Sequence, residues 1–149
     1  MTRSLLACVL AVATASGAPG GHDVPKPAAA EAFNGKVVPI STLKTKPTGA
    51  FAADAVALVT DDGKVYPIEA SDSAKKLVLD KGLHDRPMKL TATLTAASNS
   101  LRVTKVQSVV KGKVHDIDYW CENCQFSNTA PGPCVCCGGT TEFRERPAK

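Results

Sequence analysis

The sequence has few aromatic residues, no basic stripe and no long apolar run. Phe, Tyr and Trp make up 5% of the 149 residues, too few for an obvious base-stacking platform. The net charge is +4, but Lys and Arg are interspersed with Asp and Glu, so nucleic-acid binding is disfavoured. The longest apolar run falls well short of the ~20 residues of a transmembrane helix, and we expect no membrane span.

Recognisable catalytic motifs are also lacking. We find no Ser-His-Asp order, no glycine-rich phosphate loop and no H-E-x-x-H pattern. The three histidines have local interpretations: His22 lies in a Gly/Pro-rich stretch, His84 lies in a loop before a strand, and His115 is too far from the first cysteine pair to share its turn. The sequence therefore favours a protein that is not an enzyme.

The N-terminus has the layout of an export signal. Arg3 precedes a short apolar run, and Ala13-Thr14-Ala15 is a small-x-small cleavage pattern. We therefore expect a signal peptide over residues 1–15, a Gly/Pro/Ala-rich linker over 16–32, and a periplasmic or extracellular location. Leu5-Leu6-Ala7-Cys8 is similar to a lipobox, but almost no hydrophobic run precedes Cys8, so lipid attachment there is disfavoured.

The aliphatic region that follows has the periodicity of β-strands. From Met88 to Leu94, apolar residues alternate with Lys and Thr, as in a half-buried strand. Asp61-Asp62-Gly63-Lys64 separates two apolar runs and predicts a hairpin turn rather than an acid pair. Residues 35–43 predict a first strand. Residues 101–110 predict a last one, and its apolar phase shift indicates a bulge near Thr104-Lys105.

One short helix interrupts this series of strands. Residues 73–80 are compatible with a helix capped by Asp72 or Ser73 and ended before Gly82. Five strands with a helix between the third and the fourth resemble an OB-fold, a small Greek-key barrel. We therefore predict a mainly β protein with an OB-like five-stranded barrel over residues 33–112. A generic small antiparallel barrel or sandwich is the alternative.

Five of the six cysteines lie in the last 29 residues, in a region poor in aliphatics that we assign to residues 113–149. Cys121 and Cys124 are separated by two residues, and Cys134 and Cys137 repeat this spacing before Gly138. Two such turns facing each other place four thiolates in a tetrahedron, which suits Zn²⁺. Cys121, Cys124, Cys134 and Cys137 are therefore the predicted metal ligands, with Cys136 as an alternative ligand.

The cysteine pattern resembles known metal knuckles. The stretch YWCENC…CVCCGG is similar to zinc-ribbon and rubredoxin-like knuckles, and more narrowly to the desulforedoxin type, in which a later adjacent Cys-Cys-Gly follows C-x-x-C. The desulforedoxin resemblance implies Cys136 and Cys137 as the second pair, whereas zinc-ribbon spacing implies Cys134 and Cys137. The whole chain also resembles small exported bacterial proteins that join an OB-like domain to such a tail, which implies an architecture and no activity.

Three chemistries remain open for the cysteines. A structural zinc site would supply folding energy to a region that cannot build an apolar core. An iron site of the rubredoxin or desulforedoxin type would serve one-electron transfer, because the same four thiolates hold iron. Disulfides form readily in exported proteins, although five mature cysteines would leave one unpaired. We favour an exported non-enzymatic binding module with a structural zinc ribbon, whose partner is a protein, a glycan or a small ligand.

Overall fold

The computed structural model describes residues 29–149. The predicted signal peptide, most of the predicted linker, Cys8 and His22 lie outside these residues. The helices and strands, in chain order, are β1 (Glu31–Pro39), η1 (Ile40–Thr42), β2 (Val56–Thr60), β3 (Val65–Pro67), α1 (Lys75–Leu79), η2 (Lys81–Leu83), β4 (Pro87–Thr95), β5 (Ser100–Val110), β6 (Lys113–Cys121), β7 (Phe126–Asn128) and β8 (Glu142–Pro147). No helix among the described residues has the length and apolar character that crossing a membrane requires.

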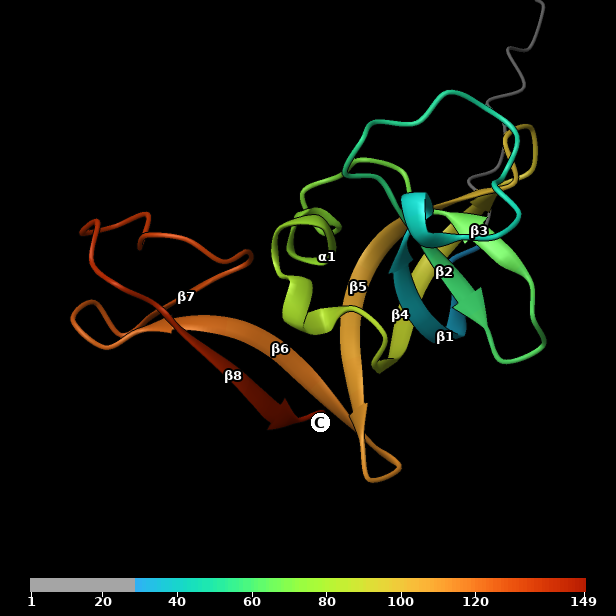
Figure 1. Cartoon of the computed structure of the whole chain (residues 1–149). Helices are drawn as coiled ribbons and strands as arrows, with labels where there is room; N and C mark the ends of the chain where they lie inside the picture. Colours follow the sequence, from blue (N-terminus) through green and yellow to red (C-terminus); the bar gives the residue numbers. More distant parts are fainter. Residues whose placement is uncertain (1–28) are drawn as a thin grey trace, which may run out of the picture.

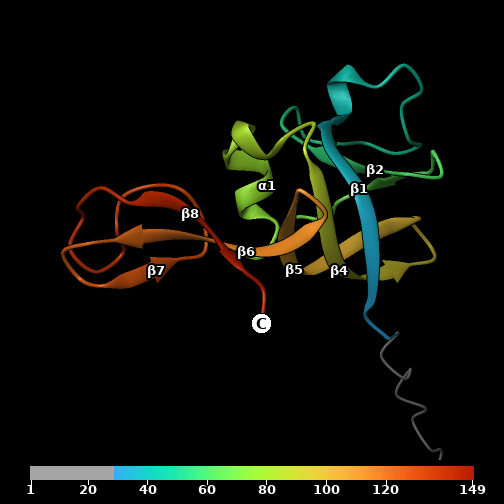
Figure 2. The same ribbon diagram turned by 90° about the horizontal axis from the view of Figure 1, so that it is seen from below.

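The strands form one mainly antiparallel sheet in the order β3-β2-β1-β4-β5-β6-β7, and β8 pairs with β6. We call residues 29–112 the body and residues 113–149 the tail. Figures 1 and 2 show β1 to β5 gathered in the body and β6 to β8 extending away from it, with α1 between the two. The protein is therefore mainly β, as predicted.

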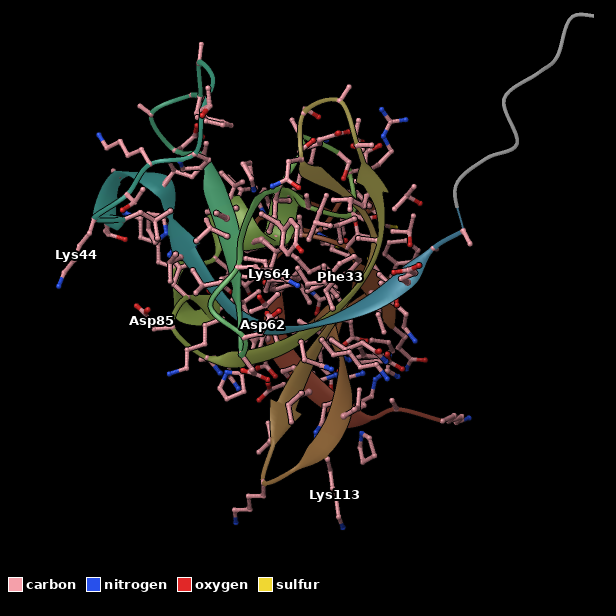
Figure 3. All side chains as sticks on the ribbon, turned by 90° about the vertical axis from the view of Figure 1, so that its right-hand side faces the viewer. Phe33, Lys44, Asp62, Lys64, Asp85 and Lys113 are labelled. Atoms are coloured by element: carbon pink, nitrogen blue, oxygen red, sulfur yellow. The ribbon has the colours of Figure 1, made fainter. Side chains whose placement is uncertain are left out.

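Two predicted details of the body are confirmed. Gly63 has a φ of 81° and its N–H donates to the carbonyl of Thr60 at 2.9 Å, which closes the turn between β2 and β3. Asp62 forms an ion pair with Lys64 at 2.8 Å (Figure 3), so the adjacent acids Asp61 and Asp62 belong to a turn.

The predicted bulge lies in the β4–β5 pairing. Thr91 faces Lys105 and Ala92 faces Val103, which leaves Thr104 as the extra residue.

Other boundaries differ from the predictions. β1 starts at Glu31, inside the predicted linker, and a 3-10 helix replaces the end of the predicted first strand. The helix α1 is shorter than predicted, and neither Asp72 nor Ser73 caps it. Instead, the hydroxyl of Ser71 accepts a hydrogen bond from the N–H of Ala74 at 3.2 Å. Ser hydroxyls and Asp carboxylates both accept hydrogen bonds from free N–H groups at helix starts, so sequence alone does not select among Ser71, Asp72 and Ser73.

The core of the body continues into the tail. The buried apolar cluster draws on β1, β2, α1, η2, β4, β5 and β6, and its members are Val37, Val56, Leu58, Ala74, Leu77, Leu83, Met88, Leu90, Ala92, Leu101, Val103, Val106, Ile117 and Tyr119. Ile117 and Tyr119 belong to β6. Beyond Ile117, Val135 is the only remaining Val, Ile, Leu or Met of the sequence, and it is 78% exposed. The tail therefore enters the apolar core through one strand only.

Two hydrogen bonds and an ion pair also hold the tail against the body. The ammonium of Lys76 in α1 donates to the carbonyl of Ile117 at 3.1 Å, and the hydroxyl of Tyr119 donates to Asp80 at 2.7 Å. Arg86 pairs with Glu145 of β8 at 2.6 Å. These contacts show that the tail packs against the α1 side of the body.

Candidate metal centre

Four cysteine sulfurs from two separate turns converge at the end of the tail. The Sγ atoms of Cys121, Cys124, Cys134 and Cys137 all lie within 4.8 Å of one another. Cys121 and Cys134 are buried, Cys124 is half-buried and Cys137 is exposed. The four cysteines predicted from spacing are therefore brought together, and their arrangement could hold a metal ion.

The first pair lies where β6 ends. Cys121 is the last residue of β6 and faces Phe126 of β7, so the chain reverses over residues 122–125. Gln125 takes a positive φ of 50°, which tightens this reversal. Strand pairing positions Cys121, and the turn carries Cys124 back toward it.

The second pair lies in a turn closed by its own backbone. The N–H of Gly138 donates to the carbonyl of Cys134 at 2.8 Å, and the N–H of Cys134 donates to the carbonyl of Gly139, also at 2.8 Å. Gly138 has a φ of 70°, a conformation that is unfavourable for residues with a Cβ. This glycine permits the turn in which Cys134 and Cys137 approach the same point.

The pKa values of Cys134 and Cys124 are shifted in opposite directions. The backbone N–H groups of Cys137 and Cys136 lower the pKa of Cys134 to about 7. The sulfurs of Cys137 and Cys136, together with burial, raise the pKa of Cys124. Crowded sulfurs oppose ionisation of one another because each new thiolate adds like charge. A bound cation would reverse this effect, since it stabilises all the thiolates at once.

Cys136 does not join the group. The second pair of the convergent set is Cys134 and Cys137, and Cys136, exposed like Cys137, lies between them in the chain. The convergent set is the one that zinc-ribbon spacing implies, and Cys136, which interacts with Cys124, stays the alternative ligand. All five cysteines of residues 29–149 are free thiols, so the disulfide alternative finds no support in the described part of the chain.

Sequence reasoning did not single out a buried carboxylate in β6, the strand that ends at Cys121. Asp118 lies in an alternating polar stretch typical of a solvated strand face, but it is only 8% exposed. It accepts a hydrogen bond from Ser127 of β7 at 2.7 Å and pairs with Arg144 and Arg146 of β8. The alternation of Arg144 and Arg146 is visible in the sequence. Only the strand pairing shows that these arginines lie opposite β6.

Of the histidines within residues 29–149, neither His84 nor His115 belongs to the convergent group. The Nε2 of His84 lies 2.7 Å from the carbonyl of Leu77, and the Nδ1 of His115 lies 2.9 Å from the carbonyl of Lys113. The bond of His84 fits its predicted role in the loop before β4, and His115 bonds to its own strand rather than to the cysteines. Comparison of the chain with protein-family models, with curated proteins and with solved structures gives no match.

Proposed function

We propose that Cys121, Cys124, Cys134 and Cys137 hold one structural zinc ion, and that the protein is an exported, non-enzymatic binding module. The observation that carries the metal assignment is the convergence of four sulfurs within 4.8 Å. A tetrahedral site with Zn–S bonds of about 2.3 Å has sulfurs about 3.8 Å apart. The Sγ atoms of Cys121 and Cys137 are 3.6 Å apart, close to this value.

A structural role follows from the donor set and its surroundings. Four thiolates complete a tetrahedron and leave no position for substrate, which is the arrangement of structural rather than catalytic zinc. The turns that carry the cysteines contain almost no aliphatic side chains. Metal binding can supply the folding free energy that such a segment lacks.

The body supports the binding role through its topology. We infer an OB-like barrel because β1 pairs with both β2 and β4, and the short helix α1 lies between β3 and β4 in the chain. A parallel bridge between Ile68 and Leu101 links the end of β3 to β5, which is the contact that would close such a barrel. Barrels of this kind present loops for ligand binding.

Elemental analysis with visible absorption spectroscopy tests the metal assignment on protein isolated from its native compartment. We expect one zinc per chain, no colour and one reactive thiol, that of Cys136. One iron per chain with thiolate-to-metal absorption would instead establish electron transfer as the function. No metal and paired cysteines would refute both. Mass spectrometry of the same sample tests export, with a mature N-terminus expected at Ser16.

Two serine variants form a matched pair for the ligand set. Cys134→Ser removes a buried member of the convergent group, so we expect zinc to be lost or bound far more weakly. Cys136→Ser changes an exposed neighbour two residues away and should keep full zinc content. The reverse result would assign the site to the desulforedoxin-like pair.

A further inference from the structure

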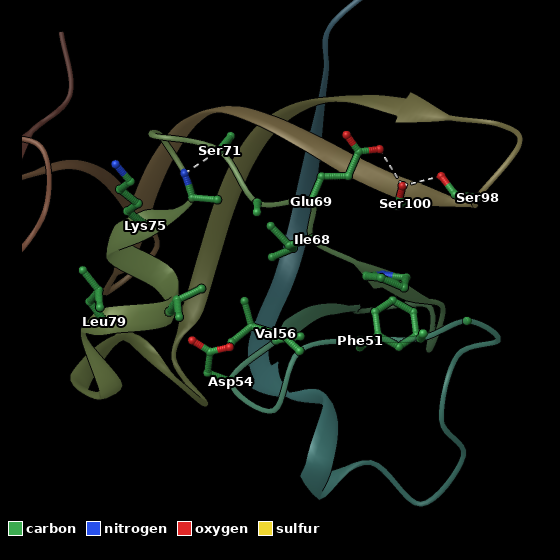
Figure 4. A pocket seen from close by; sticks show the side chains of 18 of the residues that line it. Phe51, Asp54, Val56, Ile68, Glu69, Ser71, Lys75, Leu79, Ser98 and Ser100 are labelled. Atoms are coloured by element: carbon green, nitrogen blue, oxygen red, sulfur yellow. Dashed lines mark hydrogen bonds between the residues drawn. The ribbon is translucent and has the colours of Figure 1, made fainter.

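The body carries a groove that the metal centre does not use. Its volume is about 1010 Å³, and none of the five described cysteines lines it. Three segments wall it: the loop that precedes β2, the chain from the end of β3 through α1, and the turn at Ser98 with the first residue of β5, Ser100 (Figure 4). A volume near 1000 Å³ is at the upper end of the range for small-molecule sites.

Large apolar side chains are left in solvent at this groove. Phe51 on the loop and Leu79 on α1 are 39% and 58% exposed. Val56 and Ile68 lie between them in Figure 4. Two of the six large exposed hydrophobic residues of the described chain therefore line one groove. An apolar ligand that covers them would remove their surface from water, which favours binding.

The charge of the groove is opposite to that of the whole chain. Its charged lining residues are Asp54, Glu69, Asp72 and Lys75, three carboxylates and one ammonium, in a chain of net charge +4. Glu69 accepts hydrogen bonds from Thr95, Ser100 and Arg102, and Asp72 pairs with Lys75 at 2.7 Å.

Asp54 is the exception among these charges. Within residues 29–149, its carboxylate has no hydrogen-bond or ion-pair partner, and Figure 4 shows it between Leu79 and Phe51. The groove thus combines an apolar lining with one exposed carboxylate that has no ion-pair partner among residues 29–149.

We propose that this groove binds a small apolar molecule that carries one positively charged nitrogen. The apolar part lies against Phe51 and Leu79, and the ammonium group lies at Asp54. This inference rests on the proposed binding role and names its ligand class. The size of the groove favours a small molecule, and its charge favours a cation over an anion or a neutral lipid.

The test uses three probes that share one alkyl chain and differ in head-group charge: octylamine, octanol and octanoate. Each is titrated at neutral pH into the full-length, ¹⁵N-labelled protein, and amide shifts are followed by NMR. We expect shifts at Phe51, Asp54 and Leu79 with octylamine, weaker binding of octanol and the weakest binding of octanoate. The expected gap between octylamine and octanol is about two- to fivefold, the range of a partly exposed ion pair.

Variants separate the charge from the apolar surface. Asp54→Asn should lower the affinity for octylamine to that for octanol and leave octanol unchanged. Asp61→Asn removes the same charge from the turn between β2 and β3, outside the groove, and should leave all three affinities unchanged. Leu79→Gln should weaken all three probes by a similar factor, and it should fold normally because Leu79 is mostly exposed.

Several results would overturn the inference: no shift at the groove with any probe, octanoate binding as tightly as octylamine, or equal losses from Asp54→Asn and Asp61→Asn. Shifts of the groove residues with protein concentration alone would show a second copy as the occupant and would also overturn it. Metal content is measured in every sample, so failure of the zinc assignment and failure of the groove are seen separately.

Discussion

The body buries a continuous set of aliphatic side chains, whereas the tail gathers four cysteines and a buried aspartate. Leu58, Leu77 and Leu90 in the body are fully buried. In the tail, Asp118 joins three strands through Ser127, Arg144 and Arg146. The two regions are held by different chemistry, so conditions that weaken one need not weaken the other. The predictions below separate them, from the largest expected effect to the smallest.

Metal removal should act on the tail. Apparent metal-binding free energies of about 10–16 kcal/mol are typical of structural zinc in small folds at pH 7. A strong chelator should therefore abolish amide protection across β7 and the turn from Cys134 to Gly139. Protection in β1 and β4 should persist. Hydrogen exchange measured with and without chelator checks this, and simultaneous loss in both regions would show that they form one cooperative unit.

A cavity in the body should lower the stability of the body and leave metal binding in the tail unchanged. Leu90 is fully buried among the aliphatic residues of the body, and Leu90→Ala should lower the free energy of unfolding by about 2–5 kcal/mol. Chemical denaturation measures this loss. If the cysteines hold zinc as proposed, the folded variant should keep the metal content of the unaltered protein, and a variant that folds but no longer holds metal would contradict the separation.

The junction between the two regions should respond more weakly. Tyr119→Phe removes the hydroxyl that donates to Asp80 at 2.7 Å. A hydrogen bond to a charged acceptor contributes about 1.5–3 kcal/mol, and the aromatic ring remains in place. We expect a loss in this range by chemical denaturation. Burial and the bond to Asp80 raise the pKa of Tyr119, so phenolate absorption should develop at higher pH than in an exposed tyrosine.

The smallest effect concerns Glu69 in the body. Hydrogen bonds from Thr95, Ser100 and Arg102 lower its pKa from the ordinary value of 4.5. Its contribution to stability is therefore present above pH 4.5 and is lost as pH falls through the lower folded-state pKa. Glu69→Gln should cost less than about 1 kcal/mol at pH 7. Denaturation curves of the two proteins should converge in acid, and a constant difference would show that the charge is not involved.

The sequence predicted the features that depend on local pattern. The turn at Gly63, the bulge at Thr104 and the four-cysteine group were all visible as spacing or periodicity. The sequence did not predict that β6 joins the core. Ile117 and Tyr119 are the core residues of this strand, but Asp116 and Asp118 alternate with them and give the segment a polar composition. Nor did it predict the groove, which is assembled from three segments far apart in the chain and has no local signature.

The strand β6 connects the apolar core of the body to the cysteine group of the tail. Tyr119 belongs to the apolar core and Cys121 to the cysteine group, with only Trp120 between them. If metal holds the turns that follow, then the limit of protease-resistant structure lies near Cys121 before metal arrives and near the C-terminus afterwards. In a cell compartment poor in zinc, proteases would then remove the residues that follow Cys121 and leave the body intact. The length of the fragment recovered from the cell would record whether metal reached the protein before proteases did.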